Sequence, residues 1–185
     1  MKNQETRTDF KVIFAWQDEK EEAWLHEMAS QGWHLLSVGP FVYTFSAGAP
    51  ENVVYRLDYK LTIDKDYAEY EQIFRDSGWE LVCRMSNWHY YRIKPGNYQT
   101  PEIYDSNRAK AQKYRRLMLG LIVFLPILVI LGNPALIRSV SDVEGSLAVI
   151  YGVALVIRLI LMLLFIVAIL KLMGKIKKLE SGPKE

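Results

Sequence analysis

The sequence predicts an α+β cytoplasmic domain with a duplicated βαββ unit, followed by a two-helix transmembrane hairpin. Three observations carry this prediction. Two long apolar runs lie in the C-terminal half, a weak repeat with an offset of 46 residues lies in the N-terminal half, and apolar residues alternate with period two around that repeat. Charge follows the same division: residues 1–107 hold 11 Lys and Arg against 17 Asp and Glu, while residues 108–185 hold 12 against 4. The total of +2 therefore hides an acidic half and a basic half.

The predicted cytoplasmic domain covers residues 1–94, with units at about 10–46 and 53–94. A shift of 46 residues places Trp24 on Tyr70, Gly32 on Gly78 and Trp33 on Trp79. Alternating segments at 10–16 and 53–61 predict the first strand of each unit, and helical spacing predicts helices at 18–31 and 64–77. Two further strands complete each unit. We expect a six-stranded, mainly antiparallel sheet with both helices on one face.

The ends of the two predicted helices carry recognisable signals. Asp18 and Asp64 are expected as N-caps, and further acidic residues follow in each first turn, as the helix dipole favours. Gly32 and Gly78 follow the helices, where a left-handed backbone conformation is common. These signals agree with the repeat in the placement of both helices.

Two apolar runs predict the membrane spans. Residues 117–137 contain no charge, and residues 147–170 are interrupted only by Arg158. At about 1.5 Å per residue, each is long enough to cross a hydrocarbon core of roughly 30 Å. Residues 95–116 then form a linker and basic juxtamembrane segment, 138–146 an outside loop, and 171–185 a basic cytoplasmic tail.

Lys and Arg flanks predict the orientation of the hairpin. The basic residues gather before the first span and after the second, and only Arg138 lies in the connecting loop. Because positive residues stay cytoplasmic, we expect a multi-pass membrane protein with both termini in the cytoplasm. These basic residues flank the spans, so the lipid bilayer is the expected partner and nucleic acid is not. The flanking residues are Arg108, Lys110, Lys113, Arg115, Arg116, Lys171, Lys175, Lys177 and Lys178.

Several motifs resemble the DUF2812 family of Firmicutes membrane proteins. The resemblance rests on EEAWLHEMASQGW from Glu21, YRLDY from Tyr55, and GWELVCRMSNWHYYR from Gly78, and covers most of residues 10–94. It implies a cytoplasmic domain followed by transmembrane helices in the bacterial inner membrane, often encoded beside PadR-type transcriptional regulators. It implies no activity. The βαββ order is also similar in topology to GyrI-like ligand-binding domains.

Four aromatic and charged residues form the predicted ligand site: Arg56, Asp58, Trp88 and Tyr90. Arg56 and Asp58 lie two apart on one strand face, which indicates either a cross-strand ion-pair ladder or an anion-binding Arg held by Asp. Aromatic residues in excess of what two short helices can cover favour a groove for an amphipathic ligand or a protein partner.

Signals for catalysis are missing from the sequence. Nucleophile and phosphate-loop motifs do not occur, and the three histidines show no metal-ligand spacing, so no enzyme, cofactor or metal is expected. Structural roles are expected for His26, His34 and His89. Cys83, the single cysteine, is expected to be a small buried thiol.

Arg158 is the one costly residue in the predicted spans, since a charge in mid-bilayer usually has a structural or functional partner. We interpret it as a structural or assembly contact, with homo-oligomerisation as one outcome. The hypothesis from sequence is a membrane-anchored, non-enzymatic regulatory or sensory module that recognises a ligand or protein at the inner membrane face. The alternative is a small accessory subunit of a membrane transporter or complex that uses the hairpin and Arg158 for assembly.

Overall fold

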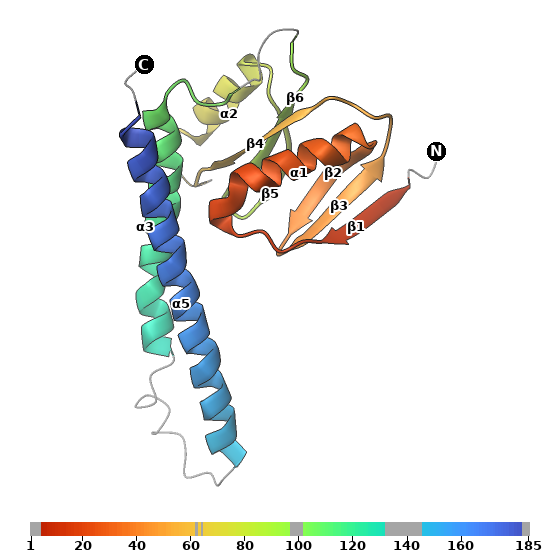
Figure 1. Cartoon of the computed structure of the whole chain (residues 1–185). Coiled ribbons are helices and arrows are strands. Elements are labelled where there is room, and N and C mark those ends of the chain that lie inside the picture. Colours follow the sequence, from red (N-terminus) through yellow and green to blue (C-terminus); the bar gives the residue numbers. More distant parts are fainter. Residues whose placement is uncertain (1–4, 62, 64, 97–101, 132–145, 183–185) are drawn as a thin grey trace. The chain divides into compact units, whose positions relative to one another are not determined.

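The chain divides into two compact units, Met1–Lys113 and Tyr114–Glu185. The structure, a computed structural model, describes residues 5–61, 63, 65–96, 102–131 and 146–182. The N-terminal unit is the α+β domain, and the C-terminal unit is helical where described (Figure 1). The predicted domain boundary at residue 94 falls inside the first unit.

The first half of the domain is a three-stranded antiparallel sheet covered by one helix. Strands β1 (Thr6–Phe10), β2 (Trp33–Gly39) and β3 (Val42–Ala47) lie in the order β1-β3-β2. A short 3₁₀ turn, Ala15–Gln17, leads into helix α1 (Asp18–Ser30), which lies across one face of this sheet (Figure 1). Trp24 of α1 packs edge-on against Tyr43 and Phe45 of β3.

The second half repeats the strand–helix–strand–strand order. Strand β4 (Val54–Tyr59), helix α2 (Tyr67–Asp76), strand β5 (Glu80–Met85) and strand β6 (Trp88–Ile93) form a sheet in the order β4-β6-β5. Phe74 of α2 stacks on Tyr91 of β6, with ring centroids 4.2 Å apart. Val54, Phe74, Trp79 and Tyr91 form a buried cluster under α2.

The predicted six-stranded sheet is wrong in one respect: the strands form two three-stranded sheets. Strands β2 and β5 lie next to each other where the two sheets meet, a boundary that we call the seam, but they belong to separate ladders. Each carries an irregularity, between Leu35 and Ser37 in β2 and between Leu81 and Cys83 in β5. A bulge disrupts the ladder locally and increases the twist of its strand, so the two bulged strands that meet at the seam do not continue one sheet.

The two sheets repeat each other closely. Strands β3 and β6 begin at Val42 and Trp88, so the 46-residue offset holds in the structure, as it does for the two irregularities. It holds for Gly32 and Gly78 too, whose φ angles are +87° and +84°. Residues with a Cβ adopt this backbone region at an energetic cost, which explains why a glycine follows each helix.

The predicted first strand of the domain is wrong. Phe10–Trp16 was expected to pair, but β1 is Thr6–Phe10, and the rings of Phe14 and Trp16 stack at 4.8 Å beside the 3₁₀ turn. Thr6 pairs with Ser46 and Tyr55 pairs with Arg92, which lie 46 residues apart, so Thr6 and Tyr55 are equivalent. The segments TRTDF and YRLDY are therefore the same strand of the two units, at an offset of 49 residues.

The helix starts also differ from expectation. Gln17 is the N-cap of α1, and Asp18, its first helical residue, turns its carboxylate to a tertiary partner. Helix α2 begins at Tyr67, three residues later than predicted, with Asp66 at the N-cap. Asp66 forms a salt bridge with Lys60 instead of capping the helix with its side chain. The predicted cap Asp64 lies outside the described residues.

The C-terminal unit contains the end of helix α3 (Asn107–Leu131) and helix α5 (Ser146–Glu180). Pro126 lies inside α3, which continues through it. Among the described residues, one helical segment, Gly152–Glu180 with 29 residues, is long and apolar enough to cross a membrane by length and composition. Its most apolar 18-residue window has a mean hydropathy of 3.2. Residues 132–145, which hold most of the predicted outside loop and the end of the first predicted span, lie outside the described residues.

The surface of α5 differs from that of a helix in a soluble protein. Only 6% of its most apolar window is buried, and Val153, Leu159 and Leu163 are each more than half exposed. A helix that is apolar around its whole circumference needs an apolar surrounding. The observed helix therefore suggests a membrane anchor. Arg158 lies within it and is half-buried.

Candidate functional site

A buried carboxylate joins the two halves of the domain. Glu21 of α1 accepts hydrogen bonds from the Tyr43 hydroxyl on β3, at 2.9 Å, and from the Tyr90 hydroxyl on β6, at 2.8 Å. All three side chains are buried. Burial raises the pKa of Glu21, while the two hydroxyls act in the opposite direction by stabilising its charge. Helix α1 thus binds both sheets through one side chain.

The next residue, Glu22, occupies the free edge of strand β4. Its carboxylate accepts the Leu57 backbone N–H at 2.8 Å, and the Lys113 ammonium donates to the Leu57 carbonyl at 3.0 Å. These side chains satisfy backbone groups that would otherwise form a bare sheet edge. Burial raises the pKa of Glu22 to about 7, although Lys113 and the Leu57 N–H both act to lower it.

Lys113 also ties α1 to helix α3. Its ammonium donates to Asp18 at 2.6 Å, and both side chains are only 1% exposed. One turn earlier, Lys110 pairs with Glu19 at 3.2 Å. Two ion pairs therefore connect the first turn of α1 with the first two turns of α3, and one of them is fully buried. Removing one partner of such a pair leaves an uncompensated charge in the interior.

Glu21, Glu22, Lys113 and their hydrogen-bond partners form a buried polar network, and the structure places the four predicted ligand residues in it or near it. Tyr90 is part of it, and the Arg56 side chain, 15% exposed, lies 3.6 Å from Glu22 and donates to Glu102 at 2.7 Å. Asp58 is buried and accepts hydrogen bonds from the hydroxyls of Tyr70, at 2.8 Å, and Tyr104. Trp88 is buried and meets Tyr59 edge-on, beside the network. Arg56 and Asp58 thus bind the segment 102–104, which explains why the compact unit extends beyond residue 94.

Sequence reasoning missed the buried contacts of four residues. It interpreted Asp18 as an N-cap, Glu21 and Glu22 as partners of the helix dipole, and Lys113 as a charge flanking the membrane span. One signal could have identified the acids. Positions 18, 21, 22, 25, 28 and 29 share one helix face, and the last three hold Leu25, Met28 and Ala29, which are buried. Acidic residues that continue an apolar face are expected to be buried with it.

The repeated strand motif builds a similar contact in each half. Lys11 follows TRTDF and lies 4.1 Å from the ring centre of Trp24, and Lys60 follows YRLDY and lies 5.6 Å from that of Tyr70. Both distances allow a cation–π contact with the helix that covers the same sheet. The equivalence of Lys11 and Lys60, like that of the motif, was readable from the sequence at an offset of 49.

A groove of about 500 Å³ lies at the seam between the two sheets. Equivalent positions of the two units line it: Leu36 and Val82, the extra residues of the two strand irregularities; His34 and Glu80; and Ser46 and Arg92. Its volume falls in the range of small-molecule sites. The remaining lining residues are Leu35, Gly48, Ala49 and Glu51.

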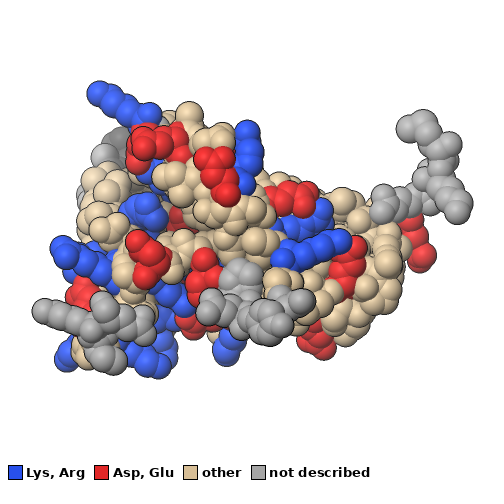
Figure 2. Space-filling model, turned by 90° about the horizontal axis from the view of Figure 1, so that it is seen from above, with Lys and Arg blue, Asp and Glu red and all other residues tan. Residues whose placement is uncertain are grey.

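The groove combines a mainly polar lining, with charges of both signs, and a few apolar side chains. Arg92 donates two hydrogen bonds to Glu80, at 2.8 and 2.9 Å, and Lys94 donates to Glu51 at 3.1 Å. The Lys94 contact lowers the pKa of Glu51, and the Glu80 contact raises that of Arg92. His34 is held by the Ala49 carbonyl at 2.8 Å. Figure 2 likewise shows acidic and basic side chains interspersed on the face in view.

The three histidines and the single cysteine take part in contacts within the domain. Within the described part of the chain, no three His, Cys, Asp or Glu side chains are grouped so that they could hold a metal ion. His26 binds the Val53 carbonyl at 2.7 Å, and His89 contacts the Tyr67 hydroxyl at 2.8 Å. Half-buried Cys83 has a pKa raised to about 12 by burial, which leaves a thiol of low nucleophilicity.

Comparison with known proteins identifies a family without an assigned activity. No curated protein and no solved structure matches this chain. The family model described as "Protein of unknown function (DUF2812)" matches residues 17–125. This match covers more than half of the chain and includes α1, the segment that carries Glu102 and Tyr104, and the Lys113 turn of α3. The chain therefore belongs to the DUF2812 family, as its motifs in the sequence indicated.

Proposed function

We propose that this chain is a membrane-anchored, non-enzymatic regulatory module that binds a small amphipathic ligand in the seam groove of its cytoplasmic domain. The observation that carries the proposal is the groove itself, lined by equivalent positions of both units. Its apolar residues, together with Arg92, His34, Glu80 and Glu51, suit a ligand that bears both charges and an apolar side chain. A zwitterionic peptide is a ligand of this kind.

A chain of contacts connects the groove with helix α3. Gly48 and Glu51, which line the groove, donate backbone hydrogen bonds to the carbonyls of Gly32 and Ala29 at the end of α1. The other end of α1 pairs with Lys110 and Lys113 of α3. A ligand that moved the 48–51 loop would act on α1, and α1 would act on the helix that leads into the first predicted span.

For the membrane part we propose two spans with both termini in the cytoplasm. The apolar surface of α5 supports one span, and the uncharged residues 117–137 with their basic flanks support the other. Single cysteines in a Cys83→Ser background test this arrangement. We expect an impermeant maleimide to label Ser141→Cys in intact cells, and to label Ser106→Cys and Ser181→Cys only after lysis. Labelling of Ser181→Cys from outside would instead indicate a single span.

Thermal unfolding of the full chain in lipid nanodiscs tests the binding proposal. The probe is a panel of dipeptides with apolar side chains, followed through the five tryptophans, which lie between residues 16 and 88. We expect some members to raise the melting temperature of the wild type and to lose this effect in the Arg92→Gln, Glu80→Gln double variant.

The matched control is the Arg84→Gln, Glu71→Gln double variant, which removes another ion pair between partly exposed side chains outside the groove. This control should keep the response to dipeptides. A panel without effect on the wild type, or equal losses in both double variants, would contradict the proposed ligand class.

A further inference from the structure

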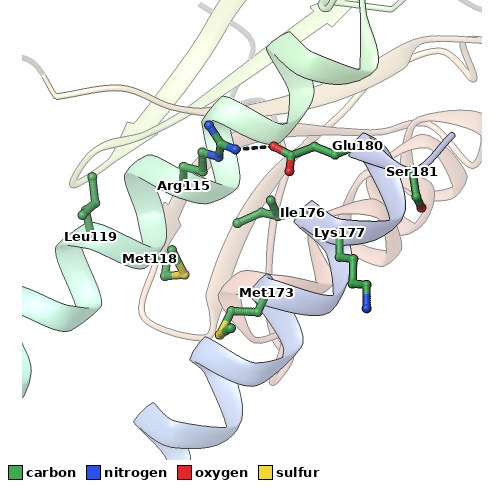
Figure 3. A pocket seen from close by; sticks show the side chains of 8 residues that line it. All are labelled: Arg115, Met118, Leu119, Met173, Ile176, Lys177, Glu180 and Ser181. Atoms are coloured by element: carbon green, nitrogen blue, oxygen red, sulfur yellow. Dashed lines mark hydrogen bonds and ion pairs between the residues drawn. The ribbon is translucent and has the colours of Figure 1, made fainter. Parts of the chain in front are cut away.

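A second hollow, of about 560 Å³, lies within the C-terminal unit between α3 and α5. Figure 3 shows Met118 and Met173 projecting from the two helices into the space between them, with Ile176 between the methionines and the Arg115–Glu180 pair. Leu119 completes the apolar wall. The polar side of the hollow is formed by Arg115, Lys177, Glu180 and Ser181.

Charge and apolar surface are separated along this hollow. Arg115 and Lys177 lie toward the basic ends of α3 and α5, and the two methionines and Leu119 lie on the side of the apolar segments. Arg116, Lys171, Lys175 and Lys178 add further positive charge nearby in the sequence. A basic pocket between membrane helices on the cytoplasmic side is the arrangement that receives anionic lipid headgroups.

We propose that this hollow binds one anionic phospholipid. Its phosphate would bind Arg115, and Lys177, whose exposed side chain points away from Arg115 in Figure 3, would turn toward it. An acyl chain would lie along Met118, Leu119 and Met173. Charge complementarity selects this occupant, because the lining carries two cations, Arg115 and Lys177, against one carboxylate, Glu180, and a neutral lipid or an apolar peptide would leave this excess positive charge unbalanced. The inference rests on the proposed membrane location of these helices.

Glu180 acts as an internal competitor for the lipid phosphate. Its carboxylate accepts a hydrogen bond from Arg115 across the hollow (Figure 3), so the phosphate must displace it to bind the guanidinium. The Arg115 and Glu180 side chains are 54% and 40% exposed, so this exchange takes place at the surface. Neutralising Glu180 should therefore strengthen lipid binding, whereas neutralising the cations should weaken it.

Native mass spectrometry of the full chain in detergent tests the proposal. The probes are phosphatidylglycerol and phosphatidylcholine with identical acyl chains, titrated separately. For the wild type we expect tighter binding of phosphatidylglycerol, by roughly fivefold for each cation engaged. Arg115→Gln with Lys177→Gln should abolish the difference, and Glu180→Gln should increase it severalfold, which a folding defect could not do.

The matched control is Arg108→Gln with Lys178→Gln, which removes two exposed charges that do not line the hollow. It should retain the preference for phosphatidylglycerol. Equal losses in both double variants would indicate general surface attraction and overturn the proposal, as would a wild type that binds the two lipids equally. Vesicle flotation separates failure of the proposed lipid site from failure of the proposed membrane location, because a chain that is not membrane-bound would fail to float with either lipid.

Discussion

The two halves of the α+β domain share one frame and differ in what their helices bury. Helix α1 carries Glu21 and Glu22, which bind groups in both sheets, whereas the equivalent positions of α2 are Tyr67 and Ala68, and the buried residue of α2 is Phe74. Helix α1 packs against β2 and β4, one strand from each half. The two repeated units thus form similar layers, and the acidic residues of α1 make this helix the link between them.

The largest difference in stability between variants of the two halves is expected at Lys113. Lys113→Met leaves Asp18 charged and buried without this partner, which should lower the free energy of unfolding by about 3–5 kcal/mol. Lys60→Met removes an ion pair of the second half, the one between Lys60 and Asp66. Because Asp66 is 62% exposed, the free energy of unfolding should fall by less than about 1 kcal/mol. Denaturant unfolding followed by tryptophan fluorescence measures both. Equal losses would show that α1 has no special role.

The pH dependence of stability should also come from α1. The pKa of Glu22 is raised by burial to about 7, from an ordinary value of 4.5, so its contribution is present below pH 4.5 and is lost as the pH rises through 7. This predicts about 2–3 kcal/mol less stability at pH 8 than at pH 5 from this group. His89, whose pKa is lowered by burial, acts in the opposite direction.

Glu22→Gln isolates the contribution of Glu22 to that pH dependence. The variant should lose the part of the decline between pH 5 and pH 8 that comes from Glu22, while the contributions of Glu21, whose pKa is also raised by burial, and of His89 remain. Exposed Glu69 of α2 provides the comparison, and Glu69→Gln should leave the profile of the wild type unchanged. A Glu22→Gln profile that also matched the wild type would place the titrating group elsewhere.

The two glycines after the helices should differ in their tolerance of a side chain. A Cβ at Gly32 would lie 2.7 Å from the Gly48 carbonyl oxygen, whereas one at Gly78 would meet only the end of Ile93 at 3.5 Å. Gly78→Ala should therefore lose about 1 kcal/mol through its positive φ alone, and Gly32→Ala about 2–3 kcal/mol through the φ and the clash. Thermal unfolding compares them. A larger loss for Gly78→Ala would contradict this difference between the halves.

The repeated strand motif should show the smallest difference. Arg56 binds Glu102 and lies beside Glu22, so Arg56→Gln should lose about 1–2 kcal/mol. Its equivalent Arg7 is 44% exposed and pairs with Asp9, so Arg7→Gln should change stability by less than about 0.5 kcal/mol. Parallel unfolding curves test both. Equal effects would mean that the 102–104 segment contributes little to the second half.

The sequence predicted most of the regular structure of the domain and failed at its first strand. TRTDF is mostly polar and exposed, and β1 lies at the edge of its sheet, paired with β3. The apolar residues Val12, Phe14 and Trp16 alternate with period two, so they were predicted as a strand although they do not form one. The resemblance of TRTDF to YRLDY was available and would have located the strand. The separation into two sheets was not, because it depends on irregularities at Leu36 and Val82 that look like ordinary strand residues.

The candidate site was predictable only in part. Arg56, Asp58 and Tyr90 stood out by residue type and spacing, but the groups that bind them come from positions 22, 102, 70, 104 and 21. Charge alone could not distinguish Glu21 from the exposed acids beside it. The ionisation of such a group depends on burial and on partners far away in the sequence.

By itself, the sequence determined the division into an acidic domain and a basic apolar half, the βαββ order, the glycines after both helices and the family. These properties depend on local periodicity, turn chemistry and composition. Only the tertiary structure decided that α1 bridges the two sheets, that Lys113 ties it to α3, and that grooves open at the seam and between α3 and α5. Contacts between distant residues set these features, because burial and pairing arise from packing that no local pattern records.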